Sequence, residues 1–511
     1  MLEVSGRDLT VEAIGRVADA SGAPVRLSPS ARVRVERSRA YLLEIIGRGD
    51  KVYGVTTGFG RLADVVISAD QRGELQRNLV RSHASGVGPP MARATVRAMM
   101  LLRANALALG HSGCRPEVIE RLLLFLERGL TPVVPSFGSV GASGDLGPLA
   151  HVALALLGEG QMEVDGAILP AAEALARAGL PPLVLEAKEG LSLINGTQAT
   201  TGMGAVALLG ARRAVAVADL AGAMSLEALR GTPEAFRPEI HQVRPHAGQI
   251  ETAARMYALL HDSEIRESHR HGDARVQDAY CLRCIPQVHG AARDAFSHAR
   301  RVIEIEANSA TDNPLVFPEQ DLVVSGGNFH AQVVAQALDF VALALADLAS
   351  ISERRLERLL NPDLSELPAF LASRPGIESG FMIAQVTSAD LGAELRVLSH
   401  PASVDSVSTS AAREDHVSMG LTAARKAARA VELLEYVLAI ELMSAAEALE
   451  HRRPLRSSAP LERAHAVIRG AVPALAGDRP LSPDLEALRA LIHDGHLDGS
   501  EHPSPSGGEA A

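Results

Sequence analysis

Residues 419–451 read MGLTAARKAARAVELLEYVLAIELMSAAEALEH, a proline-free stretch rich in Ala, Leu, Glu and Arg. Its apolar residues recur at spacings of three and four, the period of an α-helix with one buried face. Six similar windows occur along the chain, at residues 31–47, 92–108, 116–128, 205–230, 290–307 and 328–360. The sequence therefore predicts an all-α protein in which long helices pack against one another as a bundle.

Extended structure is expected only in short pieces. Met162-Glu163-Val164 and Ala167-Ile168-Leu169 flank Asp165-Gly166, a dipeptide typical of the two-residue turn of a β-hairpin. The chain is predicted to have three parts. Residues 1–200 form a smaller N-terminal lobe of short helices and Gly-rich loops, and residues 201–498 form a long-helix bundle domain. Residues 499–511 form a disordered tail rich in Ser, Pro and Gly.

The composition is that of a folded globular protein. Of the 511 residues, 47% are hydrophobic and 22% are charged, which are ordinary values for a packed chain. The formal net charge of -11 offers no polycationic surface to nucleic acid or anionic lipid, so a small molecule is the expected partner. Charged residues interrupt the apolar stretches 205–222 and 333–349, which predicts core helices and no membrane span.

The cysteines and the N-terminus favour the cytoplasm. An odd number of cysteines, three, gives no disulfide framework and suits a reducing compartment. Residues 1–5 lack the basic region and apolar run with which a signal peptide begins. Long helices of this kind commonly bury further apolar stripes between subunits, so an oligomer is expected.

The densest unusual stretch is the Gly-rich loop, residues 138–147, which reads GSVGASGDLG. Its glycines lack the G-x-G-x-x-G spacing of a dinucleotide fingerprint, which excludes that site. Asp145 stands where a serine nucleophile elbow has its last glycine, which excludes that site too. By residue type, one remaining interpretation is a tight turn that places Asp145 near the N-terminus of the following helix.

The other interpretation is internal cyclisation of Ala142-Ser143-Gly144. The amide nitrogen of Gly144 has no neighbouring β-carbon, so it can approach the carbonyl carbon of Ala142 and close a five-membered ring. Loss of water gives an imidazolone, and loss of the Ser143 hydroxyl leaves an exocyclic methylidene, an electrophile that no ordinary side chain supplies. A strained, glycine-rich turn would bring the reacting backbone atoms together.

Residues 138–151, GSVGASGDLGPLAH, closely resemble the signature of the histidine and aromatic amino acid ammonia-lyases. Further segments resemble the family's other blocks, in order, at residues 53–60, 82–88, 193–198, 276–284, 312–314, 327–330 and 414–419. The resemblance covers about residues 5–495. It implies a methylidene-imidazolone cofactor formed from Ala142-Ser143-Gly144, with no external cofactor. It also implies an all-α homotetramer whose active sites each combine residues from three subunits.

The resemblance gives roles to residues that an ammonia elimination needs. Arg283 is expected to anchor the substrate carboxylate, because its planar guanidinium can form two parallel hydrogen bonds. Tyr280 is the expected base for the β-hydrogen, since a nearby cation such as Arg283 can lower the pKa of its phenol. Tyr53 is expected to orient the substrate or to shuttle a proton.

Three more matched residues are expected around the cofactor. Asn195 and Gln277 carry amides, which both donate and accept hydrogen bonds, so either can bind the cofactor oxygen or the substrate. Phe329 is expected to form a wall beside the cofactor. Together with Ala142, Ser143 and Gly144 these residues complete the predicted cofactor environment.

The choice of substrate is expected to depend on His83 and Glu414. These two side chains form a polar, ionisable end that suits an imidazole, whereas phenylalanine would favour apolar walls. At the positions where this chain has Arg413-Glu414-Asp415, the tyrosine- and phenylalanine-selective branches have a segment that resembles Asn-Gln-Asp. Glu414 therefore favours histidine, and the expected reaction converts L-histidine to trans-urocanate and ammonia.

Several positions depart from the pattern of the histidine-specific relatives. Arg413 replaces a usual glutamine, Ser408 a usual proline, Leu395 a usual asparagine and Gln332 a usual glutamate. Ser408 resembles the 2,3-aminomutase branch, which uses the same cofactor and returns the amine to the β-carbon. A lyase or 2,3-aminomutase acting on another aromatic amino acid is therefore the alternative.

Two other readings of the sequence are disfavoured. A catalytically silent scaffold would be expected to have lost Ser143, Tyr280 or Arg283, and all three are present. Cys281-Leu282-Arg283-Cys284 has the spacing of a redox or zinc pair, but the chain has no second pair, so no metal is expected.

Overall fold

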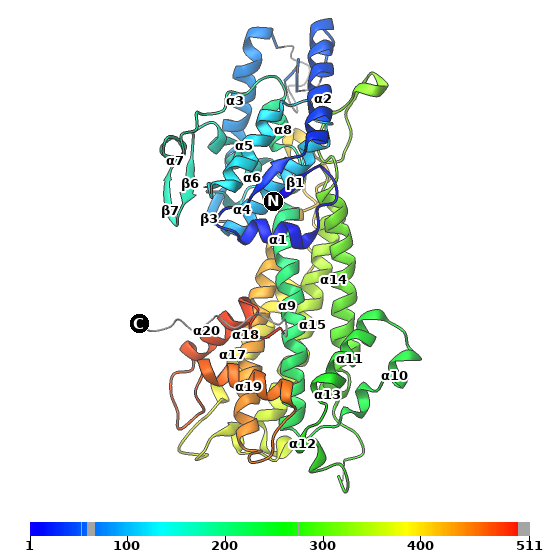
Figure 1. Ribbon diagram of the computed structural model, residues 1–511, viewed down its shortest axis with the longest axis vertical. Helices are drawn as coiled ribbons and strands as arrows, with labels where there is room; N and C mark the ends of the chain where they lie inside the picture. The colour runs from blue at the N-terminus through cyan, green and yellow to red at the C-terminus, as the bar shows by residue number, and fades with distance from the viewer. Residues whose placement is uncertain (53, 59–66, 274, 499–511) are drawn as a thin grey trace. The chain divides into compact units, whose positions relative to one another are not determined.

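A computed structural model describes residues 1–52, 54–58, 67–273 and 275–498 (Figure 1). Tyr53 lies outside the described residues. The tail 499–511, for which the sequence predicts disorder, also lies outside them. Most of the described chain is helical and the strands have two to four residues each, which confirms the predicted all-α class.

Contacts divide the chain into two compact units, each assembled from three segments. Unit 1 contains residues 1–209, 299–339 and 401–428, and unit 2 contains residues 210–298, 340–400 and the chain from residue 429 onward. The division into consecutive domains at residue 200 stays a prediction.

Each predicted helical window is occupied by a helix. The helices are α2 (Pro29–Arg48), α4 (Arg93–Ala108), α5 (Pro116–Glu127), α9 (Gln198–Ala228), α14 (Ile285–Ala307), α15 (Gln332–Leu360) and α18 (Gly420–Glu450). Local chemistry sets the ends of α2. The Ser28 hydroxyl accepts a hydrogen bond from the Ala31 amide at 3.2 Å, Pro29 occupies the first turn, and Gly49 ends the helix with φ +81°.

The rest of unit 1 consists of short elements around α4 and α5. Its helices are α1 (Val11–Asp19), α3 (Arg72–His83), α6 (Leu146–Leu156), α7 (Ala171–Arg177) and α8 (Glu189–Ile194). Its strands are β1 (Leu2–Val4), β2 (Val25–Leu27), β3 (Val87–Pro90), β4 (Thr131–Pro132), β5 (Pro135–Phe137), β6 (Gln161–Val164), β7 (Ala167–Pro170), β8 (Leu315–Phe317) and β9 (Leu322–Val324).

The strands of unit 1 form small sheets. β1 pairs with β2 in parallel, and the antiparallel pairs are β3 with β5, β4 with β6, β6 with β7, and β8 with β9. The predicted hairpin is confirmed, because β6 and β7 flank Asp165 and Gly166, which have φ +50° and +80°. Positive φ at both central residues matches the right-handed twist of the strands.

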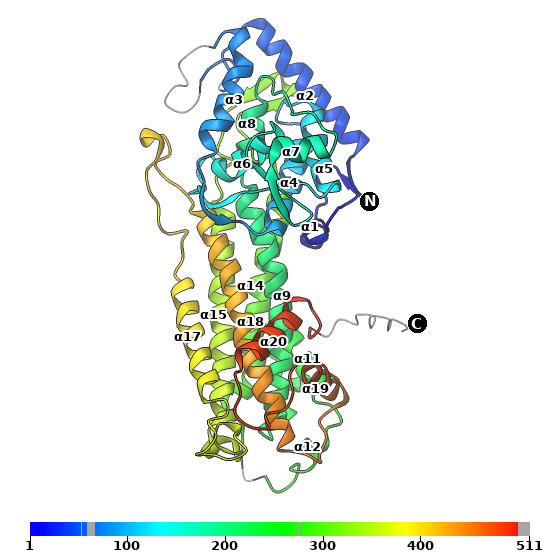
Figure 2. The ribbon, with the colours of Figure 1, turned by 90° about the vertical axis from the view of Figure 1, so that its left-hand side faces the viewer.

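In unit 2, segments of α9, α14, α15 and α18 lie side by side (Figures 1 and 2). Buried polar contacts join them: Arg355 of α15 forms an ion pair with Glu441 of α18 at 2.6 Å and 2.9 Å, and His289 of α14 forms a hydrogen bond with Asp219 of α9 at 2.8 Å. The remaining helices of unit 2 are α10 (Pro238–Gln242), α11 (Ala247–Leu259), α12 (Glu264–Glu267), α13 (Tyr280–Arg283), α16 (Pro362–Ser365), α17 (Met382–Leu398), α19 (Ala459–Ala471) and α20 (Ser482–His493).

One helix among the described residues, α15, is long and apolar enough to cross a membrane. In its most apolar window 67% of the residues are buried, which is typical of a core helix in a folded domain.

Candidate active site

The Gly-rich loop connects β5 to α6 and has an unusual backbone. Gly141, Ser143 and Gly144 have φ values of +75°, +52° and +77°. A serine in the left-handed region is strained, and such strain collects at functional sites. A β-carbon on Gly144 would lie 2.2 Å from the carbonyl oxygen of Gly196, so only glycine fits where these two backbones meet.

Asp145 holds the loop from its buried side. It directly precedes α6, as the turn interpretation predicts, yet its carboxylate binds the start of α9. Oδ2 accepts from the Thr200 amide at 2.7 Å, and Oδ1 accepts from the hydroxyls of Ser139 at 2.8 Å and Thr200 at 3.0 Å. Burial raises the pKa of Asp145. The Ser139 hydroxyl also accepts from the Gly141 amide at 3.0 Å, which tightens the loop.

Asn195 contacts the loop at the oxygen that cyclisation would keep. This residue ends α8, and its Nδ2 donates to the Ser143 carbonyl oxygen at 2.8 Å. In an imidazolone closed from Gly144 nitrogen and Ala142 carbonyl carbon, the Ser143 oxygen remains as the ring's exocyclic carbonyl. A buried amide donor aimed at this oxygen, with Gly144 packed against Gly196, fits the cofactor that the sequence predicts.

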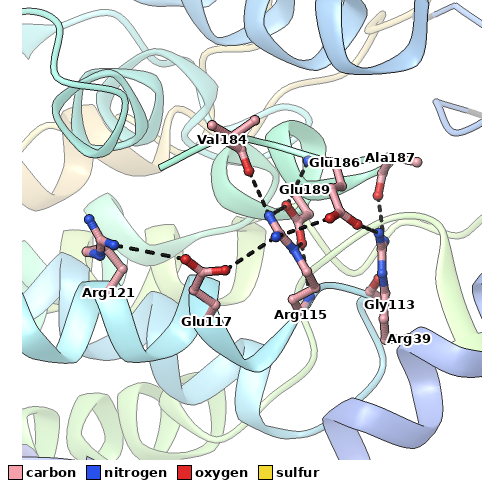
Figure 3. Close-up of polar contacts among 9 residues, drawn as sticks. All are labelled: Arg39, Gly113, Arg115, Glu117, Arg121, Val184, Glu186, Ala187 and Glu189. Atoms are coloured by element: carbon pink, nitrogen blue, oxygen red, sulfur yellow. Dashed lines mark hydrogen bonds and ion pairs between the residues drawn. The ribbon is translucent and has the colours of Figure 1, made fainter. Parts of the chain in front are cut away.

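Ionic contacts fix the helix that carries Asn195. Glu189, the first residue of α8, binds the Arg115 guanidinium at 2.8 Å and 2.7 Å (Figure 3). The segment that leads into α8 is joined to α2, because Arg39 donates to the Ala187 carbonyl oxygen at 2.9 Å. On its buried side Lys188 binds Asp312 at 2.7 Å. Charge-assisted contacts on two sides restrict the movement of α8 and hence of Asn195.

A cavity of about 620 Å³ within unit 1 opens onto the loop. Its lining includes the predicted site residues His83, Ala142, Gly144 and Glu414, and also Ser82, Phe137, Thr409 and Arg425. Glu414 lies against the tripeptide, because Oε1 accepts from the Ser143 hydroxyl at 2.6 Å. Its Oε2 accepts from the Thr409 hydroxyl at 2.7 Å. The structure thus brings a carboxylate to the serine that cyclisation would dehydrate.

The orientation of His83 follows from its backbone contact. Nδ1 lies 2.8 Å from the carbonyl oxygen of Leu79, which can only accept, so Nδ1 carries the proton in this hydrogen bond. In the neutral form of the ring, Nε2 is then the acceptor. His83 therefore adds an acceptor to a cavity that already holds the Glu414 carboxylate.

Arg425 is a cation of this cavity that sequence reasoning missed. Its guanidinium lies 4.2 Å from the centre of the Phe137 ring and donates to the Ser136 carbonyl at 2.8 Å. Burial lowers its pKa. These contacts tie α18 to the strand that leads into the Gly-rich loop. Within a helical repeat of Ala, Arg and Lys, nothing in the sequence distinguishes Arg425 from its neighbours.

The remaining predicted residues of the described chain are not among those that line this cavity. Tyr280, Arg283 and Gln277 belong to unit 2. There the Arg283 guanidinium lies 4.7 Å from the centre of the Tyr280 ring, and Tyr280 is 72% exposed. Phe329 is half-buried just before α15 and is not among the residues lining the cavity. Their predicted roles stay predictions.

The fold and the site define a class of protein. It is an all-α enzyme with a strained Ala-Ser-Gly tripeptide that faces a cavity containing a carboxylate. The family model for aromatic amino acid lyases matches residues 9–470. The chain belongs to the aromatic amino acid lyase family, and membership implies a methylidene-imidazolone cofactor.

Individual relatives resemble the chain over nearly its whole length. A histidine ammonia-lyase of Anaeromyxobacter dehalogenans is 55% identical over 505 residues, which cover 97% of this chain and 99% of that protein. The structure of a histidine ammonia-lyase from Trypanosoma cruzi matches with TM-score 0.90 and 43% identity, covering 97% of this chain and 94% of that one. A tyrosine aminomutase from Streptomyces globisporus matches with TM-score 0.93 and 40% identity, covering 97% of each chain.

Proposed function

We propose that this chain is a carbon–nitrogen lyase that eliminates ammonia from L-histidine to give trans-urocanate. The observation that carries the choice of histidine is the position of Glu414, whose carboxylate lines the cavity and contacts Ser143 at 2.6 Å. An imidazole N–H is a good donor to a carboxylate, and an apolar phenyl ring is not. The 55% identity to a histidine ammonia-lyase over the full chain supports the same substrate.

The cofactor of this reaction forms from Ala142-Ser143-Gly144 without an external group. Once formed, it supplies an electrophilic carbon that ordinary side chains lack. Three features of the loop support this origin: the left-handed Ser143, the close packing of Gly144 on Gly196, and the Asn195 amide at the Ser143 oxygen. Asn195 donates to that oxygen, and its own Oδ1 is buried with no hydrogen-bond partner among the described residues.

The two ends of the substrate are held by residues of different charge. Glu414 accepts from the N–H of the imidazole, His83 contacts the same ring, and Arg283 binds the carboxylate with its planar fork. Tyr280 removes the β-proton. The Arg283 guanidinium lies 4.7 Å from the centre of its ring, which keeps the base and the carboxylate anchor together. Tyr53, Gln277 and Phe329 complete the contacts to substrate and cofactor.

The enzyme is a cytoplasmic homotetramer whose active sites are shared between subunits. Tyr280 is 72% exposed and Val276, four residues before it, is 99% exposed. A base that must act in a site closed to bulk water needs a cover, and a neighbouring subunit supplies one. This exposure supports the shared site. Light scattering and an inactive-subunit mixing experiment would test the assembly.

Product analysis tests the proposed reaction. Purified protein is incubated with L-histidine, L-tyrosine and L-phenylalanine in separate reactions, and the products are identified by mass spectrometry. Trans-urocanate and ammonia are expected from histidine, and Ser143→Ala should form neither. The peptide containing residues 142–144 should have lost two water molecules in the active enzyme. Active protein with an unmodified peptide would refute this origin of the electrophile.

The second candidate is a 2,3-aminomutase or lyase acting on another aromatic amino acid. It is favoured by Ser408 and by the similarity to a tyrosine aminomutase with TM-score 0.93. In the same experiment it would give a β-amino acid or a cinnamate from tyrosine or phenylalanine, and no urocanate from histidine. That result would replace the histidine assignment and leave the cofactor unaffected.

A further inference from the structure

Arg103 of α4 lies directly behind Asn195. Its side chain is buried, and NH1 donates to the Asn195 carbonyl oxygen at 2.8 Å and to Gln198 Oε1 at 2.9 Å. Gln198 in turn donates to the Thr311 hydroxyl at 2.7 Å. A β-carbon on Gly196 would lie 2.4 Å from Arg103 NH1, so glycine is needed next to Asn195 for the guanidinium to reach it.

The charge of Arg103 is buried without an ion pair. Burial lowers the pKa of Arg103, and no carboxylate lies within ion-pair distance of it among the described residues. Asp312 acts on it only through its field, because the Asp312 carboxylate is bound by Lys188 at 2.7 Å. Burying an unpaired cation costs free energy of folding. A functional role beside the candidate site would explain why Arg103 is there.

A second buried arginine on the same helix provides the comparison. Arg97 donates to the carbonyl oxygens of Val17 and Leu126, each at 3.1 Å, and these belong to α1 and α5. Burial lowers the pKa of Arg97 to about 10. Arg97 thus joins three helices and contacts nothing in the Gly-rich loop, whereas Arg103 binds the residue that contacts Ser143.

We propose that Arg103 is a positioning residue for the cofactor, an inference that rests on the proposed function. It acts through Asn195. Arg103 binds the backbone carbonyl oxygen of Asn195. This contact keeps the side-chain Nδ2 of Asn195 at 2.8 Å from the Ser143 carbonyl oxygen. The positive charge of Arg103 lies behind this hydrogen bond and favours negative charge on the same oxygen. A more polarised carbonyl makes the conjugated methylidene carbon more electrophilic.

The test compares full-length Arg103→Met and Arg103→Lys with wild type and with the matched control Arg97→Met. Circular dichroism and light scattering establish folding and assembly. The mass of the peptide containing residues 142–144 gives the cyclised fraction. Borohydride, a simple hydride donor, then reacts with the cofactor, and the loss of its ultraviolet absorption gives a rate that needs no substrate.

For Arg103→Met we expect either an uncyclised peptide or a cofactor that reacts with borohydride about tenfold more slowly than in wild type, which corresponds to about 1.4 kcal/mol. Arg103→Lys keeps the charge, but one compact ammonium cannot copy the fork, so an intermediate loss is expected. Arg97→Met should lower the melting temperature while the cyclised fraction and the rate match wild type.

The inference is overturned if both Arg103 variants match Arg97→Met in cyclised fraction and borohydride rate. If Arg103→Met does not fold, Arg103→Lys decides by the same comparison. An uncyclised peptide in wild type would overturn the proposed function, and this inference with it. A cyclised wild type with unaffected Arg103 variants would overturn this inference alone.

Discussion

Gly144→Ala is the substitution for which the structure gives the clearest expectation. Gly144 has φ +77°, and an added β-carbon would lie 2.2 Å, 2.5 Å and 2.7 Å from the oxygen, carbon and nitrogen of Gly196. These are backbone atoms, so no side chain can rotate away. One of the two backbone segments must move. A shift of the segment around Gly196 would displace Asn195 and its hydrogen bond to Ser143.

The loss of stability has two parts that a control can separate. An L-residue in the left-handed region costs about 1 kcal/mol whatever its surroundings. Gly166 in the β6–β7 turn has φ +80° with nothing within 4 Å of an added β-carbon, so Gly166→Ala should lose only this part. Overpacking adds about 1–3 kcal/mol, so Gly144→Ala should lose about 2–4 kcal/mol.

Denaturant unfolding of both variants measures these losses, and mass spectrometry measures the cyclised fraction. Gly166→Ala should be cyclised like wild type. Gly144→Ala should retain the mass of its unmodified tripeptide, because the nucleophilic nitrogen no longer approaches the Ala142 carbonyl carbon. If Gly144→Ala were fully cyclised and no less stable than Gly166→Ala, the close approach to Gly196 would have no role in making the cofactor.

Three further outcomes are expected. Glu414→Gln keeps the shape of the side chain but removes its charge, and steady-state kinetics should show kcat/KM for histidine reduced about 10- to 100-fold, the value of a charge-assisted hydrogen bond. Burial raises the pKa of Cys114 to about 12, so iodoacetamide at about pH 8 should label this thiol only after unfolding, as peptide mapping would reveal. The hydrogen bond to Glu435 raises the pKa of His493, so its contribution to stability is full below the unfolded value of about 6.5 and is lost as the pH rises through the folded value. The denaturation midpoint of wild type should be lower above this pH range than below it. The share of that decrease that comes from His493 should be absent in His493→Gln.

The helices could be predicted because their periodicity is local, whereas one boundary depends on distant residues. The apolar window begins at residue 205, yet α9 begins at Gln198. The extra residues, 198–204, make about two turns and have no apolar stripe. The carboxylate of Asp145, from another part of the chain, accepts from the Thr200 amide and stabilises the start of the helix. No local pattern contains that contact.

The same reasoning separates the parts of the site that the sequence reveals from those that it hides. Ser143, Asn195 and Glu414 stand in recognisable segments, and hydrogen bonds bring them together. Thr409 and Arg103 act through geometry alone: the hydroxyl of one holds Glu414, and the guanidinium of the other holds Asn195. A threonine in a loop and an arginine in a helix carry no sequence signal of such contacts.

The positions of the unusual residues affect the choice between histidine and another substrate. Arg413 and Ser408 are exposed and are not among the residues lining the cavity, and Leu395 is buried in unit 2. None of these three departures is therefore among the residues that line the described cavity, whereas Glu414 is one of them.

The local backbone shows how Glu414 is placed. Ser410, Ala411 and Ala412 have φ values of +52°, +53° and +62°, and three consecutive left-handed residues other than glycine are strained by about 1 kcal/mol each. Three hydrogen bonds between Thr409 and Glu414 close this turn: Thr409 donates through its amide at 2.9 Å and its hydroxyl at 2.7 Å, and its carbonyl oxygen accepts from the Glu414 amide at 3.4 Å. Strain of this size is retained where it positions a functional group. Here it brings a carboxylate to the cavity, which favours a substrate with an N–H at the far end of its side chain.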